Sequence, residues 1–276
     1  MFSQGHLVWA AVSACVIAAG LCICFKKKPK LKELLRVALI IGIISEIIKF
    51  LSVAEMVPMV NPAVVDSGGN LSVEYVPTGQ YTPYVPLEHI PFELCSLFIV
   101  FLILALFVKD GPWKRGLYAL MFAAGTIGAA IAIILPSITM YLNTPSDYFT
   151  RPLVYQFFIY HSVIVVVCIY IGGSKEAGLC SKDWKAAING LILLDLPTYY
   201  LNSVFSSEIY YNDTVVGVTH RINFFSSYVN PLGLVLTEKW QWIVYLLIRL
   251  IIAVDLVIGL FHTPLLYRNN HQKVDS

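Results

Sequence analysis

HLVWAAVSACVIAAGLCICFKKKPK, residues 6–30, is the stretch that determines the class of this protein. Residues 6–25 are mostly apolar, and four lysines follow within the next five positions. A helix that spans a bilayer needs about 20 mostly apolar residues, and Lys and Arg in short loops stay on the cytoplasmic side. The stretch therefore predicts a membrane helix that runs from outside to inside. No basic residue precedes it, which is the reverse of a cleavable signal peptide, so we expect it to be retained.

The composition of the whole chain is that of a membrane protein. Of its 276 residues, 58% are hydrophobic and 13% are charged, whereas soluble domains carry about 25% charged residues. The mean hydropathy is +0.73. A formal net charge of +2 with no basic domain excludes the electrostatic footprint of a nucleic-acid-binding protein. The connections between apolar runs, roughly thirty residues at most, are too short for a separate globular domain. We expect one domain, residues 1–276, whose partners are membrane lipids and not nucleic acid.

Seven apolar segments are long enough to span a bilayer. They are residues 6–25, 33–57, 88–108, 116–136, 153–171, 186–206 and 241–261. Fourteen Lys and Arg residues lie in or beside the connections on one side, and only Arg151, Arg221 and Lys239 lie on the other. The basic side is predicted to be cytoplasmic. We therefore predict an all-α, multi-pass integral membrane protein with seven transmembrane helices, the N terminus outside and the C terminus inside. It would lie in the cell membrane if the source is bacterial.

Two long connections, residues 58–87 and 207–240, fall on the predicted outer side. Both are too polar for the bilayer, and neither has the composition of a Gly/Ser linker. We expect them to cap a cavity that opens outward.

Ionisable side chains inside a span are costly unless they pair or line a wet cavity, so each one is a candidate for a site. The outer halves of the segments contain Glu46, Lys49, Cys95, His161, Asp195, Asn202 and Arg249, and His89 and Glu93 lie near the outer surface. A polar chamber in the outer leaflet would satisfy these groups together. Structural pairing is the alternative, because Glu46 and Lys49 share one helical face and Arg249 can neutralise Asp195 or Glu46.

Cys95 and His161 are the candidate catalytic pair. At about 1.5 Å per helical residue, Cys95 lies roughly 10 Å and His161 roughly 13 Å below the outer ends of their segments. A thiol becomes a useful nucleophile beside a base or a cation, and an imidazole titrates near neutral pH. Glu93 is about 200° from Cys95 on a regular helix. We therefore expect Glu93 at the rim of the site, or as a residue that orients another group.

The six histidines are scattered along the chain, and the sequence has no His-x-x-x-His or Cys-x-x-Cys motif. His89 and Glu93 have a spacing compatible with metal ligands, but a hydrogen-bonded pair is the more common outcome of that spacing. We predict no metal site and no cofactor.

The sequence Pro91-Phe92-Glu93-Leu94-Cys95 resembles the Pro-x-His-x-Cys signature of the YwaF-like integral membrane family, with Glu93 in place of the family's His. That family is similar to a eukaryotic phospholipid acyltransferase family in which a membrane Cys and a His on a later helix carry acyl transfer. His161 occupies the matching position in the fifth segment. Asn223-Phe224-Phe225 and Trp240-Gln241-Trp242 resemble the family's Asn-Tyr-Met and Trp-Pro-Trp segments.

These observations favour acyl transfer, or acyl-ester cleavage, on a membrane lipid from the outer leaflet. His161 would take the thiol proton of Cys95, and the thiolate would attack the ester carbonyl. Asn202, Asn223 or Lys49 would stabilise the oxyanion or a head-group phosphate.

Two other functions compete with acyl chemistry. A transporter for a small polar solute would use Glu46, Lys49, Asp195, Arg249 and Asp255 as a relay across the membrane. A seven-helix receptor or photoreceptor is disfavoured because the last segment contains no Lys for a retinal Schiff base and no Asp-Arg-Tyr sequence follows the third segment.

Overall fold

The computed structural model describes residues 3–66, 71–86, 89, 93–136, 138, 142, 144–211, 214–220, 238–263 and 266. Each of the seven predicted segments contains a described helical stretch. The long helices are α1 (Gln4–Lys27), α2 (Leu31–Val53), α3 (Leu94–Phe107), α7 (Pro152–Gly173), α8 (Trp184–Val204) and α9 (Lys239–Phe261). The fourth segment is a rod of three consecutive elements: α4 (Pro112–Leu120), the π-helical turn η2 (Met121–Gly125) and α5 (Thr126–Ile134). The short helices are α6 (Asp147–Thr150), η4 (Lys175–Ala177) and η5 (Ser181–Asp183).

Four of the described helices are long and apolar enough to cross a membrane: Gln4–Lys27, the rod Pro112–Ile134, Pro152–Gly173 and Trp240–Phe261. α3 is apolar but has only 14 residues, so it is shorter than a typical span. It begins at Leu94, and not at residue 88 as predicted, because Glu93 has an extended backbone and acts as the N-cap. α2 has 23 residues, but Glu46 and Lys49 lie in its C-terminal half and basic residues in its first turns.

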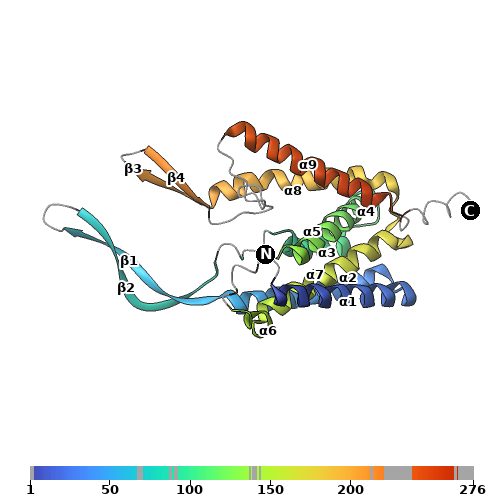
Figure 1. Ribbon diagram of the computed structural model, residues 1–276, viewed down its shortest axis with the longest axis horizontal. Coiled ribbons are helices and arrows are strands. Elements are labelled where there is room, and N and C mark those ends of the chain that lie inside the picture. The colour runs from blue at the N-terminus through green and yellow to red at the C-terminus, as the bar shows by residue number, and fades with distance from the viewer. Residues whose placement is uncertain are drawn as a thin grey trace, which may run out of the picture.

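α7 lies at the centre of the helical assembly (Figure 1). Of the four long apolar helices it is the most buried, with 72% of its most apolar window covered by protein. Val154, Phe158 and Ile171 are fully buried on it. From α1, the Trp9 ring stacks on Phe158 at a centroid distance of 5.5 Å. Because α7 contacts α1, α2, α5 and η2, its side chains determine how these helices are rotated against one another.

The π-helical turn allows the fourth rod to approach α7 closely. All five residues of η2 are buried, and π-helical turns of this kind are often found at functional sites. A Cβ added to Gly172 of α7 would clash with the Phe122 ring, and a Cβ added to Gly125 would clash with the Cys168 sulfur. Glycine at these two positions is therefore required for the contact between η2 and α7.

The chain is mostly helical, but the prediction of an all-α fold is wrong, because the described residues include two β-hairpins. β1 (Glu55–Asp66) pairs antiparallel with β2 (Leu71–Tyr84), and β3 (Ser206–Tyr211) pairs antiparallel with β4 (Thr214–His220). The register of the first hairpin shifts between Pro58 and Val60. Proline cannot donate to a ladder and is tolerated because both strands of a two-stranded sheet are edges.

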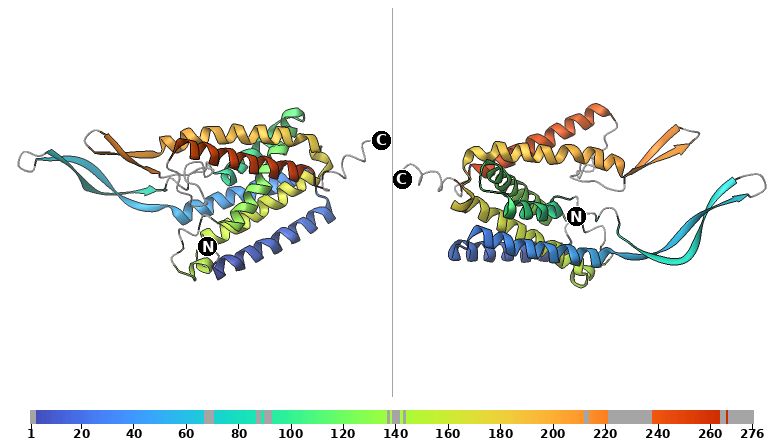
Figure 2. Two further views of the ribbon diagram at one scale, coloured as in Figure 1. Left: turned by 45° about the horizontal axis from the view of Figure 1, so that its top comes forward. Right: turned by 180° about the vertical axis from the view of Figure 1, so that it is seen from behind.

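Both hairpins project from the same end of the helical assembly and point away from it (Figures 1 and 2). β1 continues from the last turn of α2, and β3 continues from the last turn of α8. The predicted cap over an outward cavity is therefore not formed by the described part of residues 58–87. Helix α1 begins at the hairpin end of the assembly, and α9 ends at the opposite end.

Candidate functional site

Glu46, Lys49 and Ser96 form a closed hydrogen-bonded triangle between α2 and α3. The Lys49 ammonium lies 2.7 Å from one Glu46 carboxylate oxygen and donates to Ser96 Oγ at 2.9 Å. Ser96 in turn donates to the other Glu46 oxygen at 2.7 Å. The predicted pairing of Glu46 with Lys49 is confirmed, and the buried Ser96 fixes the pair to α3. Ser96 was missed in the sequence because a serine one residue after Cys95 carries no signal of its own.

Glu93 reaches the Cys95 thiol, although the two were predicted to point apart. The Cys95 sulfur donates to Glu93 Oε2 at 3.8 Å. The helical-wheel argument that separated them does not apply, because Glu93 precedes the first helical residue and has φ −72° and ψ 153°. The extended N-cap places its carboxylate next to the first turn of α3. Lys49 and Glu46 both bond to Ser96, the residue that follows Cys95, so the four groups form one cluster.

His161 is buried on α7 with a defined tautomer. Its Nδ1 lies 2.6 Å from the carbonyl oxygen of Phe157. A carbonyl only accepts, so Nδ1 carries the hydrogen and Nε2 of the neutral ring is left as a proton acceptor. Nε2 has no hydrogen-bond partner among the described residues. The Phe157 carbonyl, and not Glu93, therefore fixes the tautomer of His161.

Cys95 and His161 lie on neighbouring helices at a similar level. Phe98, one turn after Cys95, and Ile164, one turn after His161, both approach Gly125: a Cβ built there would lie 3.0 Å from the Phe98 ring and 3.3 Å from Ile164. No hydrogen bond between the thiol and the imidazole is present in the described residues.

Tyr160 joins α7 to the start of α3. Its hydroxyl donates to the carbonyl oxygen of Cys95 at 3.1 Å. This bond holds the segment that carries Cys95 against α7. Gly42 of α2 makes room for it, since a Cβ there would lie 3.3 Å from the Tyr160 oxygen. Tyr160 was not singled out in the sequence, where it was one of 16 tyrosines.

Asp195 and Arg249 form a second polar pair, between α8 and α9. The guanidinium of Arg249 lies 2.5 Å from the Asp195 carboxylate, so the predicted neutralisation of Asp195 by Arg249 is confirmed. Thr198 and Asn202, on the same face of α8, are buried. Pro197 removes a backbone donor from the helix, and Thr198 Oγ1 donates to the Asp195 carbonyl at 2.6 Å. The four charged groups Glu46, Lys49, Asp195 and Arg249 are thus divided between two ion pairs.

The remaining candidates are less defined. His89 is half-buried, and its backbone N–H donates to the Pro86 carbonyl at 2.9 Å. Asn223 lies outside the described residues. Within the described ranges, no group of three or more His, Cys, Asp or Glu side chains is arranged to hold a metal ion.

The model of the TMEM164 family matches residues 1–259. The chain belongs to the TMEM164 family. Together with the long apolar helices, this membership identifies an integral, multi-pass membrane protein that contacts membrane lipids. Comparisons with curated proteins and with solved structures found no match. The resemblance to the YwaF-like family and to lipid acyltransferases stays a prediction.

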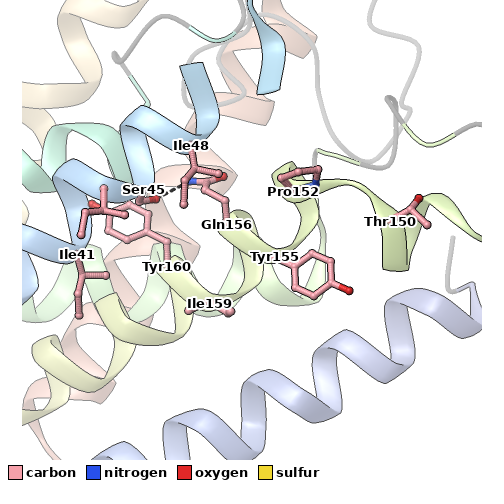
Figure 3. A pocket seen from close by; sticks show the side chains of 10 residues that line it. Ile41, Ser45, Ile48, Thr150, Pro152, Tyr155, Gln156, Ile159 and Tyr160 are labelled. Carbon is pink, nitrogen blue, oxygen red and sulfur yellow. Dashed lines mark hydrogen bonds between the residues drawn. The ribbon is translucent and has the colours of Figure 1, made fainter. Parts of the chain in front are cut away.

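In this TMEM164 family member, an apolar groove lies beside the Cys95 cluster, between α2 and α7 (Figure 3). Its volume is about 430 Å³. It is lined by Ile41, Ile44, Ser45 and Ile48 of α2, by Thr150 of α6, and by Pro152, Tyr155, Gln156, Ile159 and Tyr160 of α7. Gln156 Nε2 donates to Ser45 Oγ at 2.6 Å across the groove. The hydropathy of the sequence could not predict this groove, because the groove is formed by residues from separate helices, and their packing is a tertiary feature.

Proposed function

We propose that this protein transfers or cleaves acyl esters of membrane lipids at Cys95. The observation that carries the proposal is the hydrogen bond of the Cys95 thiol to Glu93, 3.8 Å away, beside a lysine that Glu46 and Ser96 hold in place. A cation near a thiol favours the thiolate, which is the reactive nucleophile. His161, with Nε2 available, is the general base.

The reaction proceeds in two balanced halves. The Cys95 thiol gives its proton to His161 Nε2, and the sulfur attacks the ester carbonyl carbon. A C–S bond forms, the ester C–O bond breaks, and the leaving lysolipid oxygen takes the proton from His161. A second lysolipid hydroxyl, or water, then gives its proton to His161 and attacks the thioester carbonyl; a C–O bond forms, the C–S bond breaks, and His161 returns the proton to the Cys95 sulfur. In both halves Lys49 stabilises the oxyanion or a head-group phosphate, and Glu93 positions the thiol.

Acyl turnover tests the proposal directly. Purified protein in vesicles would be given a phospholipid labelled in its acyl chain together with an unlabelled lysophospholipid. Cys95→Ala and His161→Ala are expected to abolish transfer, and wild-type protein is expected to carry a hydroxylamine-sensitive acyl group on Cys95. Cys15→Ala, an exposed cysteine on α1, serves as the matched control. Undiminished turnover in both site variants would end the proposal.

The topology that goes with this function has seven crossings, with the N terminus and both hairpins outside and the C terminus inside. It rests on the distribution of Lys and Arg and on the two hairpins, which leave the same end of the helical assembly. A Cys-free protein with a single cysteine at Thr82 in β2 is expected to react with a membrane-impermeant maleimide in intact cells, and one at Lys182 in η5 only after lysis. The opposite pattern would overturn this topology.

The transport alternative uses the same charged groups. A relay needs carboxylates that exchange partners during a cycle, whereas Glu46 and Asp195 are each ion-paired with a nearby cation. Because both carboxylates are already paired, we favour acyl chemistry over transport as the function of Glu46 and Lys49.

A further inference from the structure

We propose that the groove between α2 and α7 holds one acyl chain of the lipid that reacts at Cys95. The inference rests on the proposed function for the role of that lipid. The residues that line the groove are the evidence that a lipid chain occupies it.

The lining excludes water and polar solutes. Four of the ten residues that line the groove are isoleucines: Ile41, Ile44 and Ile48 of α2 and Ile159 of α7. The two polar side chains in the middle, Ser45 and Gln156, are hydrogen-bonded to each other. A cavity of about 430 Å³ is also within the range of roughly 300–1,000 Å³ that ligand sites occupy. A hydrocarbon chain is the ligand that such a surface accepts.

The bilayer supplies that ligand from the side. Ile44 and Ile159 are half-exposed, at 51% and 44%, on helices of a membrane protein, so the groove opens toward lipid. From Pro152 to Tyr160 the α7 wall is about 12 Å long at 1.5 Å per residue. The hydrophobic effect does not drive a chain from lipid into an apolar groove, so van der Waals fit determines occupancy. Binding should therefore be sensitive to groove shape.

The groove lies next to the reactive cluster, and Tyr160 links the two. Tyr160 forms part of its wall, and the same side chain donates to the Cys95 carbonyl. Ser45 in the opposite wall directly precedes Glu46 of the ion-paired triangle. Figure 3 shows Tyr160 and the hydrogen-bonded Ser45–Gln156 pair in the groove wall.

Photo-crosslinking in vesicles tests the groove without depending on turnover. The probe is a phosphatidylcholine with a diazirine at the end of one acyl chain, and adducts are mapped by mass spectrometry of peptides. On the α2 peptide we expect adducts at groove residues in the wild type and in Cys95→Ala. Ile44→Trp should reduce them about tenfold, since an overpacked site weakens binding by about that factor. Ile40→Trp, on the same helix and 58% exposed but outside the groove, should leave them unchanged.

The outcomes separate the two proposals. Adducts spread evenly over the exposed face of α2, Ile40 included, would show annular lipid only and overturn the groove, whatever the turnover. Adducts confined to the groove, with turnover unchanged in Cys95→Ala, would support the groove and refute acyl chemistry at Cys95. The wild-type adduct map decides the groove even if Ile44→Trp does not fold.

Discussion

The Cys95 thiol donates a hydrogen bond to the Glu93 carboxylate, with its sulfur 3.8 Å from Oε2. This contact exists because Glu93 lies just outside the helix and folds back over its first turn, while its carbonyl accepts the Leu97 N–H at 2.9 Å. The thiol is therefore oriented by a group on its own segment before any contribution from α7.

A positioning role for Glu93 predicts a graded response. Glu93→Gln keeps an oxygen acceptor of the same reach and should retain acyl turnover within about threefold, whereas Glu93→Ala should lose about 10- to 100-fold. Glu93→His, which restores the pattern of the YwaF-like family, should retain activity. Initial rates with labelled phospholipid measure this series. Equal acyl-transfer rates in Glu93→Ala and the wild type would show that Glu93 does not position the thiol.

The Glu46–Lys49 pair is expected to matter for stability in a non-additive way. Lys49→Met leaves a carboxylate without its cation and should lower the free energy of unfolding by about 3 kcal/mol, whereas the double variant Glu46→Gln/Lys49→Met should recover much of that loss. Reversible unfolding in detergent measures the cycle.

The chain offers a matched control on the same helix. Glu33 and Arg36 have the same three-residue spacing and a 2.7 Å contact, but their side chains are 57% and 51% exposed. Arg36→Met should therefore change stability by less than about 1 kcal/mol. An equal effect of Lys49→Met and Arg36→Met would contradict the importance of the Ser96 triangle.

The Asp195–Arg249 pair should hold α8 to α9. Arg249→Leu leaves the Asp195 carboxylate without its close cation and should lower the thermal unfolding temperature, because an uncompensated charge at that depth is costly. The exchanged variant Asp195→Arg/Arg249→Asp should be more stable than either single variant. Thermal unfolding in detergent gives the comparison, and an exchange no better than Arg249→Leu would refute direct pairing.

Close packing of η2 against α7 predicts a large effect of one methyl group. Gly172→Ala would force its Cβ into the ring of the fully buried Phe122 and should destabilise by about 1–3 kcal/mol. Phe122 also packs edge-on against Phe261 at 5.2 Å, so α9 should be disturbed as well. Gly259→Ala on α9, where no atom lies within 4 Å of the added Cβ, is the control. Similar unfolding temperatures for the two variants would be inconsistent with the close contact.

The sequence could predict the seven helical stretches because hydropathy acts locally: each run of about 20 apolar residues has its own transfer free energy, whatever its neighbours. It predicted the Glu46–Lys49 pair for the same reason, since residues three apart share a helical face. It failed at the first turn of α3, because one extended residue, Glu93, moved the helix start, and it failed on the hairpins, whose pairing joins residues up to 29 positions apart, from Glu55 to Tyr84.

The sequence alone determined that this chain is a membrane protein, which stretches are helical, and which polar residues have to find partners within them. Only the tertiary structure decided which partners those are: Ser96 for Lys49, Tyr160 for the Cys95 carbonyl, Gln156 for Ser45. These contacts depend on how each helix is rotated about its axis and how closely it approaches the next. Both quantities are determined by packing at positions such as Gly42, Gly125 and Gly172, where the lack of a side chain lets one helix touch another.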